Sequence, residues 1–151
     1  MATLRIGVRC LLLFAAALLG GCAATMELPK DFLHLADSAD FRAVTGDDAR
    51  VWIRTFDDDN EATLEFWADS LANDFTQRGY ELVGKGEVTN GNGRPGRWFE
   101  CAANVRGERI GYLVAIWVDG DDVTVAEFAA RAEVFGKRVE SVRAALRTVR
   151  P

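Results

Sequence analysis

Two stretches of the chain repeat their hydrophobic positions with the period of an amphipathic helix. In residues 61–79 the apolar side chains fall on one stripe, made of Leu64, Trp67, Ala68, Leu71, Ala72 and Phe75. In residues 131–149 the stripe is made of Ala132, Phe135, Val139, Val142, Leu146 and Val149. Gly79 stands where the first stripe stops, as glycine does at helix ends. The spacing predicts two helices that each bury one face.

Most of the remaining chain reads as strands separated by turns rich in Gly, Asp and Asn. A hairpin is expected at 41–45 and 50–56, and a meander of four strands at 80–89, 97–105, 110–118 and 123–128. The run 110–118 is apolar on both faces, which is typical of a strand covered on both sides. The element order is therefore ββαββββα. It predicts an α+β fold with a mainly antiparallel sheet and helices packed on it.

Two junctions in this order resemble the PsbP-like fold. They are Arg78-Gly79-Tyr80-Glu81-Leu82-Val83, where a helix gives way to a strand, and Val125-Ala126-Glu127-Phe128, which leads into the last helix. That fold includes extrinsic subunits of photosystem II, a Ran-binding protein and small bacterial envelope lipoproteins. The resemblance covers about residues 40–149 and rests on order and spacing. It implies a non-catalytic binding or assembly role and carries over no functional residue.

The N-terminus has the pattern of an export signal. Arg5 and Arg9 precede an uncharged run of residues 10–19, which is shorter than the about 20 residues that a membrane-spanning helix needs. Leu19-Gly20-Gly21-Cys22 then resembles the lipobox of bacterial lipoproteins. The resemblance implies cleavage between Gly21 and Cys22, diacylglycerol on the thiol and a fatty acyl chain such as palmitate on the new amine. An ordinary secretory signal and an uncleaved apolar helix are the alternatives.

These signals divide the chain into three parts. We expect a lipoprotein signal peptide at 1–21, a lipidated tether and lead-in at 22–39, and a single α+β domain at 40–151. Once Cys22 is lipidated, Cys101 is the only free thiol of the mature chain and His34 its only histidine. Cys101 alternates with apolar neighbours, so we expect a buried thiol and not a Cys/His catalytic pair. We expect no metal and no cofactor.

Charge argues against nucleic acid as a partner. The chain has a formal net charge of −5, and phosphate backbones repel an acidic surface. Residues 22–75 hold 13 acidic and 4 basic residues, and residues 76–151 hold 10 acidic and 12 basic residues.

Three motifs have simple structural explanations. Gly91-Asn92-Gly93-Arg94-Pro95-Gly96 fits a phosphate-binding G-x-G-x-x-G, but a strand pattern follows it and not a helix, so a mobile hairpin loop is expected. The acidic run 57–61 lacks the Gly and Glu of an EF-hand loop, and we expect it to form a turn that caps the first helix. Asp119, Asp121 and Asp122 are expected in a hairpin turn.

The surface offers two candidates for a partner. Lys137, Arg143 and Arg147 belong to the basic side of the last helix, although basic residues spread around the polar arc favour a solvated face over a docking site. Phe66 projects opposite the apolar stripe of its helix, where it could anchor a partner or be covered by residues 28–39.

The sequence as a whole predicts a lipid-anchored protein of the cell envelope, held by Cys22 at the outer membrane on the periplasmic side, that binds an envelope protein and does no chemistry. The alternative is a carrier of a small apolar ligand, with a pocket between sheet and helix lined by Trp67, Trp98 or Trp117. An enzyme is the least favoured class, because no set of nucleophile, base and acid is visible.

Overall fold

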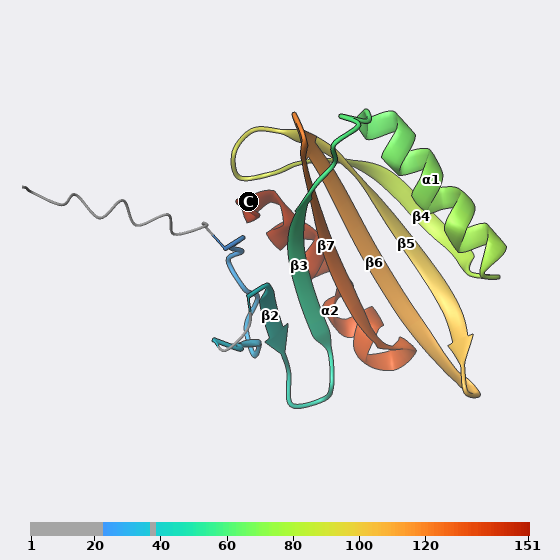
Figure 1. Cartoon of the computed structure of the whole chain (residues 1–151). Coiled ribbons are helices and arrows are strands. Elements are labelled where there is room, and N and C mark those ends of the chain that lie inside the picture. Colours follow the sequence, from blue (N-terminus) through green and yellow to red (C-terminus); the bar gives the residue numbers. More distant parts are fainter. Residues whose placement is uncertain (1–22, 37–38) are drawn as a thin grey trace, which may run out of the picture.

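The computed structural model describes residues 23–36 and 39–151, which form one antiparallel sheet with a helix on each face (Figure 1). The strand order is β1-β2-β3-β7-β6-β5-β4. The strands are β1 (Leu33–His34), β2 (Phe41–Val44), β3 (Arg50–Asp57), β4 (Glu81–Thr89), β5 (Pro95–Val105), β6 (Glu108–Asp119) and β7 (Asp122–Arg131). The helices are α1 (Leu64–Gln77) and α2 (Ala132–Ala145), and a short 3₁₀ helix, Leu146–Thr148, follows α2.

This architecture confirms the predicted α+β fold and the order of its elements, with the two-residue β1 as an addition. The predicted lipobox at 19–22 lies outside the described residues, so lipidation of Cys22 stays a prediction. Within the described residues, no helix is both long enough and apolar enough to cross a membrane.

The two helices close two separate cores because the central strands are apolar on both faces. Along β6, Leu113 belongs to the core beneath α2 and Val114 to the core beneath α1. On β7, Phe128 lies on the α2 side and Val125 on the α1 side. Successive side chains of a strand point to opposite faces. A continuous apolar run therefore contributes side chains to both cores, as the pattern of residues 110–118 predicted.

The turn before α1 differs in detail from the expected one. The N-cap is Thr63, whose side chain accepts a hydrogen bond from the backbone N–H of Phe66 at 3.2 Å. The acidic run lies upstream of it, where the Asp58 carboxylate accepts from the backbone N–H groups of Asn60 and Ala62 at 3.1 and 2.9 Å. Asp58 thus stabilises the turn, whereas Thr63 is the residue that caps the N-terminus of the helix. The expectation that an acid of this run caps α1 is wrong.

The described part of segment 22–39 packs against the domain. Ala24 and Met26 are buried in the α2-side core, and Leu28 packs against it. The backbone of Thr25 pairs with that of Arg150 in an isolated bridge. Apolar side chains at 24, 26 and 28 follow the period of a strand, which explains why this side of the segment is buried. The folded unit therefore begins at least as early as residue 24.

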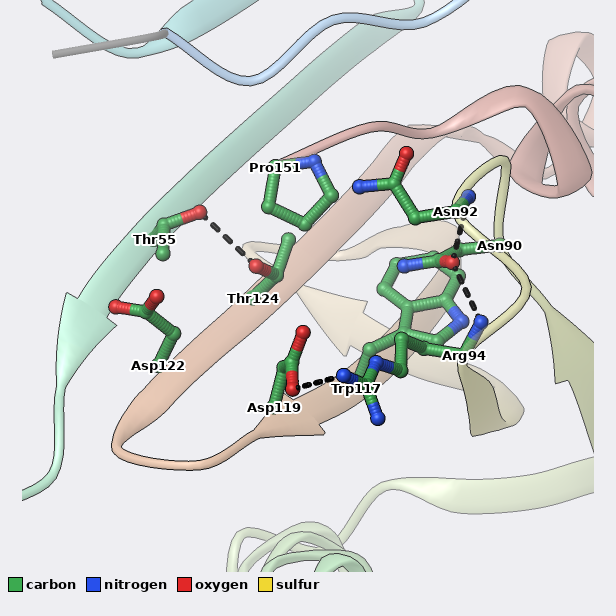
Figure 2. A pocket seen from close by; sticks show the side chains of 9 residues that line it. All are labelled: Thr55, Asn90, Asn92, Arg94, Trp117, Asp119, Asp122, Thr124 and Pro151. Carbon is green, nitrogen blue, oxygen red and sulfur yellow. Dashed lines mark hydrogen bonds and ion pairs between the residues drawn. The ribbon is translucent and has the colours of Figure 1, made fainter.

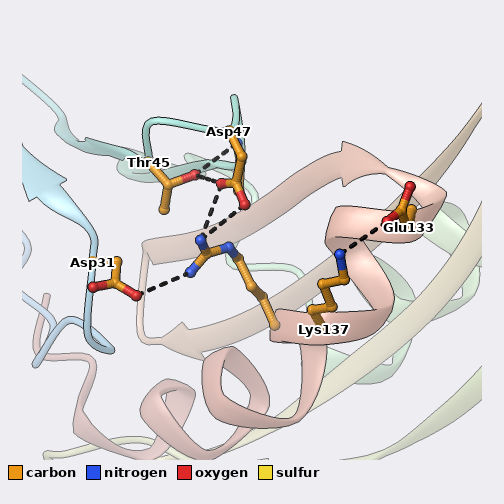
Figure 3. Close-up of polar contacts among 7 residues, drawn as sticks. Asp31, Thr45, Asp47, Glu133 and Lys137 are labelled. Carbon is orange, nitrogen blue, oxygen red and sulfur yellow. Dashed lines mark hydrogen bonds and ion pairs between the residues drawn. The ribbon is translucent and has the colours of Figure 1, made fainter.

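Arg138 of α2 fastens this segment and the β2–β3 turn to the helix. Its terminal Nη2 donates to both carboxylate oxygens of Asp47 at 3.1 and 2.9 Å, and the guanidinium lies 4.0 Å from Asp31 (Figure 3). The same guanidinium lies over the ring of Phe32, 5.7 Å from its centroid. Hydrogen bonds from Thr45 and Arg138 hold the pKa of Asp47 below its ordinary value. Three parts of the chain thus meet at one cation.

Candidate functional site

Helix α1 covers only half of its face of the sheet. It packs mainly on β4, β5 and β6, and it reaches β3 and β7 only at one end, through Phe56, Val123 and Val125. Over β2 and the rest of β3 and β7, no helix of the described residues lies on that face (Figure 1). We call the uncovered area the open face. It consists of Arg42, Val44, Arg50, Trp52, Arg54, Glu127, Ala129 and Tyr112, which share one side of β2, β3, β7 and β6.

An aromatic side chain lies at the centre of the open face between two cations. The guanidinium groups of Arg42 and Arg54 lie 4.9 and 4.7 Å from the centroid of the Trp52 ring. The Trp52 Nε1–H donates to Asp40 at 3.0 Å. Cation–π contacts and this hydrogen bond hold the half-buried indole in one orientation. The structure therefore presents a fixed aromatic surface and not a mobile one.

A polar network adjoins Trp52. The Tyr112 hydroxyl donates to the Glu127 carboxylate, and Glu127 Oε2 lies 3.6 Å from a terminal nitrogen of Arg54. Neither Arg54 Nε nor Glu127 Oε2 has a hydrogen-bond partner among the described residues. Burial, followed by the charge of Glu127, raises the pKa of Tyr112 well above its ordinary value. Tyr112 is consequently a hydrogen-bond donor and not a base at neutral pH.

Two grooves meet at this network. One, of about 540 Å³, runs over the open face from Leu35 and Arg42 to Ala129. The other, of about 370 Å³, lies between the open face and α1, where Leu71 and Arg78 form its far wall. Tyr112 and Glu127 line both grooves. The open face and the flank of α1 thus form a continuous concave surface.

Sequence reasoning missed this surface. Its signal was the alternation along residues 50–54, where Val51 and Ile53 are buried while Arg50, Trp52 and Arg54 share the other side. Such a strand has one apolar face and one face of aromatic and cationic side chains. Only the position of α1 shows that nothing in the described residues covers the second face.

The partner surfaces suggested by the sequence do not come together. Phe66 on α1 is 58% exposed and contacts the neighbouring Trp67 edge-to-face, with ring centroids 5.9 Å apart. Lys137, Arg143 and Arg147 lie on α2 or the 3₁₀ helix after it, on the opposite side of the sheet. Residues 28–36 pack with the α2-side core and β2, far from the helix that carries Phe66.

The basic residues of α2 also differ in their surroundings. Arg143 is half-buried, forms ion pairs with Glu100 and Glu140, and lies over the Trp98 ring at 4.5 Å. Exposed Lys137 pairs with Glu133 at 2.9 Å (Figure 3). Arg143 therefore packs the helix onto β5, and it differs from the exposed cation that the sequence suggested.

The lone histidine and the thiol lie in different parts of the sheet. His34 on the edge strand β1 stacks on Phe41, with ring centroids 4.7 Å apart. Cys101 on β5 is 1% exposed beneath α1, and strands β2, β3, β7 and β6 lie between the two. Burial raises the pKa of the Cys101 thiol to about 11. The thiol is therefore a protonated core side chain with no histidine in reach, as its apolar neighbours predicted.

The tryptophans proposed to line a carrier pocket are each engaged separately. Buried Trp117 donates from Nε1 to the Val88 carbonyl at 3.2 Å, and Trp67 donates to Asp58 at 3.2 Å. Trp98 lines a groove of about 320 Å³ between α1 and the β4–β5 edge, whereas Trp117 lines a different pocket at the end of the sheet. Trp98 and Trp117 pack on the α2 side of the sheet and Trp67 on the α1 side, so the three side chains cannot line one pocket between sheet and helix.

The remaining motifs form turns. The glycine-rich string connects β4 and β5 as a hairpin loop, and strand β5 follows it where a dinucleotide site would need a helix. Asp119 to Asp122 form the β6–β7 turn, as expected. No group of three or more His, Cys, Asp or Glu side chains among the described residues is arranged to hold a metal ion.

Known proteins resemble this chain in structure and not in sequence. No protein-family model and no curated sequence matches it. LpqN of Mycobacterium tuberculosis, described as involved in cell envelope biogenesis, superposes with a TM-score of 0.67 at 12% identity, covering 85% of this chain and 83% of LpqN. PA94 of Pseudomonas aeruginosa, of unknown function, gives 0.60 at 11% identity, covering 85% and 97%.

The third structure is the cyanobacterial PsbP protein CyanoP of Synechocystis sp. PCC 6803. It superposes with a TM-score of 0.56 at 10% identity, covering 91% of this chain and 98% of CyanoP. At these identities the likeness concerns the fold alone. The chain has the α+β fold of PsbP-like proteins.

Proposed function

We propose that this chain is a non-catalytic binding protein of the cell envelope and that its open face docks a protein partner. The observation that carries the proposal is the uncovered half of the α1 side of the sheet, with Trp52 held between two arginines beside Tyr112. Trp, Tyr and Arg are the residues that contribute most to binding energy at protein interfaces. The exposed apolar side chains Leu33 and Leu35 border the same area.

The absence of chemistry is part of the proposal. The Cys101 thiol is buried and its pKa is raised to about 11, so it would be a poor nucleophile at neutral pH. His34 stacks on an aromatic ring at the sheet edge, and Tyr112 holds its proton against Glu127. A fixed, pre-shaped surface suits recognition, because little side-chain ordering is then required on binding.

An envelope location is supported by two independent features. Residues 19–22 resemble a lipobox, which would place lipid on Cys22, and the structural neighbour LpqN is described as involved in cell envelope biogenesis. Ala24, two residues after Cys22, is already buried in the core. A chain advances at most about 3.6 Å per residue, so an anchor on Cys22 would hold the domain directly at the membrane. We favour the periplasmic side of the outer membrane.

Site-specific photo-crosslinking in the native membranes tests the docking surface. The full-length chain carries a photo-reactive amino acid at Arg50, on the open face, or at Lys137, on exposed α2. We expect one discrete protein adduct from position 50, identified by mass spectrometry, and none from position 137. Trp52→Ala in the same chain should weaken the adduct at least about tenfold, the typical cost of a central aromatic anchor.

Phe66→Asp is the matched variant for the alternative surface. Phe66 is an exposed aromatic of α1 outside the open face, so its substitution should leave the adduct unchanged. An adduct that is lost with Phe66→Asp and retained with Trp52→Ala would move the partner to α1. If the Trp52→Ala chain gave as much of the adduct as the unaltered chain, the proposal would be overturned.

The anchor has its own test. Cys22→Ser removes the thiol that would accept diacylglycerol, so the chain should leave the membrane fraction or accumulate uncleaved. Normal membrane retention of correctly cleaved Cys22→Ser protein would contradict the anchor without affecting the docking surface.

A further inference from the structure

A second concave site lies at the end of the sheet, on the α2 side and therefore on the opposite face from the open face. It has a volume of about 350 Å³, within the range of small-molecule sites. Its lining comes from the ends of β3, β6 and β7, the β4–β5 loop and the last residue of the chain (Figure 2). The lining residues are Thr55, Asn90, Asn92, Arg94, Trp117, Asp119, Asp122, Thr124 and Pro151. We call it the end pocket.

Asn90 supplies a fixed hydrogen-bond donor to the end pocket. Its Oδ1 accepts from the backbone N–H groups of Asn92 and Arg94 at 3.0 and 2.9 Å. Those bonds assign the oxygen of the amide and leave Nδ2 pointing toward the pocket (Figure 2). Asn90 is only 5% exposed, and its Nδ2 has no hydrogen-bond partner among the described residues. A buried donor of this kind calls for an acceptor in the pocket.

The loop that carries Asn90 is held in place. The backbone N–H of Gly91 donates to the Val149 carbonyl at 2.8 Å. A Cβ at Gly91 would come within 2.9 Å of the Arg150 side chain and 3.0 Å of the Thr148 carbonyl, so a larger residue here would push against the C-terminal segment. The loop that the sequence predicted to be mobile is thus tied to the C-terminal segment, and its donor is pre-positioned.

The opposite wall of the end pocket is acidic. Asp57, Asp119 and Asp122 occupy facing positions at the ends of β3, β6 and β7, with Asp121 in the adjoining turn. Only Asp119 has an ion-pair partner among the described residues, namely Arg94 at 2.7 Å. Burial, followed by the charges of Asp121 and Asp57, raises the pKa of Asp122. A cation at Asp122 would relieve this repulsion.

Two hydroxyl groups, those of Thr55 and Thr124, lie between Asn90 and Asp122 (Figure 2). Thr55 and Thr124 join their Oγ1 atoms at 2.9 Å across β3 and β7. That contact uses one hydroxyl hydrogen, so the pair can still donate one hydrogen bond and accept others. Trp117, the buried cross-strand neighbour of Thr124, is fixed by its bond to Val88 and supplies an apolar part of the lining.

We propose that the end pocket binds a small amino alcohol, with its ammonium group at Asp122 and the threonine hydroxyls and its hydroxyl oxygen accepting from Asn90 Nδ2. A primary ammonium group needs several acceptors, which the carboxylate and the hydroxyls supply. The neighbouring oxygen satisfies the buried amide. This site does not depend on the docking surface, because the two lie on opposite faces of the sheet.

The test uses ¹⁵N-labelled full-length chain in mild detergent, titrated with ethanolamine and followed by NMR. We expect saturable shifts of the Asn90 side-chain amide and the Trp117 indole N–H. Propylamine, which keeps the charge without the oxygen, should bind about fivefold more weakly, and ethylene glycol, which lacks the charge, should give no saturable shift. Equal responses to all three probes, or none to ethanolamine, would overturn the proposal.

Two variants test whether the ammonium group binds at Asp122. Asp122→Asn keeps the shape of the side chain and should weaken ethanolamine binding at least about tenfold. Asp121→Asn, in the same turn but outside the pocket lining, should leave binding within about twofold. Unchanged binding by Asp122→Asn would contradict the assignment. If Asp122→Asn does not fold, the comparison of the three probes on the unaltered chain decides.

Ethanolamine also occurs as a lipid headgroup, and a parallel titration separates the two sources. Phosphatidylethanolamine added to the detergent should reproduce the shifts if the pocket accepts a headgroup. Shifts with free ethanolamine alone would indicate a soluble ligand.

Discussion

The two faces of the sheet differ in how much of their width is covered by other elements. The α2 face is closed along most of its width by α2, the 3₁₀ helix and residues 24–32. Among the described residues, the other face is closed by α1 mainly over β4 to β6 and at one end of β3 and β7. Strands lie about 4.8 Å apart and a helix is about 10 Å wide, so one helix covers two to three of the seven strands. On the α2 face, the N-terminal segment 24–32 covers strands that α2 does not reach.

The composition of the uncovered strands shows that the open face is not an unfinished core. Where α2 and its neighbours cover the sheet, β3 presents Val51 and Ile53, whereas its open side presents Arg50, Trp52 and Arg54. Cationic and aromatic side chains tolerate water and also bind strongly when a partner excludes it. The binding sites that we propose therefore lie where structural cover is lacking. The proposed end pocket follows the same rule, because it lies beyond the end of α2.

The largest contrast between the faces is expected from removing one aromatic ring from each. Phe128 is buried against Phe135 with ring centroids 5.1 Å apart, so Phe128→Ala should lower the free energy of unfolding by about 4 kcal/mol. Trp52→Ala removes a larger but half-buried ring and should cost about 1 kcal/mol. Urea unfolding of both variants measures the difference. Equal losses would show that Trp52 is structural, which would break the comparison.

A second prediction concerns the covered half of the α1 face. Burial raises the pKa of Cys101 to about 11 from an ordinary value of 9.0. The neutral thiol therefore stabilises the folded state fully below about pH 9, and this contribution is lost as the pH rises from 9 to 11, because the unfolded chain releases its proton first. The stability of the natural chain relative to Cys101→Ala should fall by about 2 kcal/mol over that window.

Unfolding free energies of the two proteins at pH 8.5, 10 and 11 give the measurement. The difference between them cancels the titration of Tyr112 and of other groups common to both. A pH-independent difference would mean that water reaches the thiol beneath α1.

The smallest effect is expected from a variant that removes the ion pairs between α2 and the N-terminal segment. Arg138→Met retains the apolar stem but loses the pairs with Asp47 and Asp31. We expect a loss of about 1 kcal/mol. We also expect faster hydrogen exchange at the Leu35 amide, which donates to the Arg42 carbonyl at 2.8 Å. Lys137→Met removes only an exposed pair with Glu133 and serves as the control. Equal exchange in both variants would show that packing alone holds the N-terminal segment.

Local patterns in the sequence were sufficient to predict the elements. The helical stripes around Phe75 and Val139, the stop at Gly79 and the alternation along the meander depend on residues close in sequence, and the structure has each of these elements. The N-cap was misplaced because Asp58 and Thr63 can both accept backbone hydrogen bonds, and only the geometry of the turn selects between them.

The candidate sites could be recognised only in part. The sequence predicted that Phe66 lies opposite the apolar stripe of its helix and that Cys101 is buried, since each follows from its own helix or strand; that residues 28–39 leave Phe66 uncovered was not predicted. It did not show the engagement of Arg143 with Glu100, which is 43 positions away in sequence. Nor did it show that Asn90 and Asp122 line one pocket, because that requires the register of β3, β6 and β7 and the attachment of the β4–β5 loop.

What the sequence by itself determined was periodicity: which residues of each strand and helix share a side, and in what order the elements follow. The tertiary structure decided which of those sides are covered. Periodicity is set by backbone geometry, which repeats within a few residues. Cover depends on the placement of α1 over β4 to β6, of residues 24–32 against the α2-side core and of the β4–β5 loop beside Val149. These contacts join residues far apart in the chain, so no local pattern encodes them.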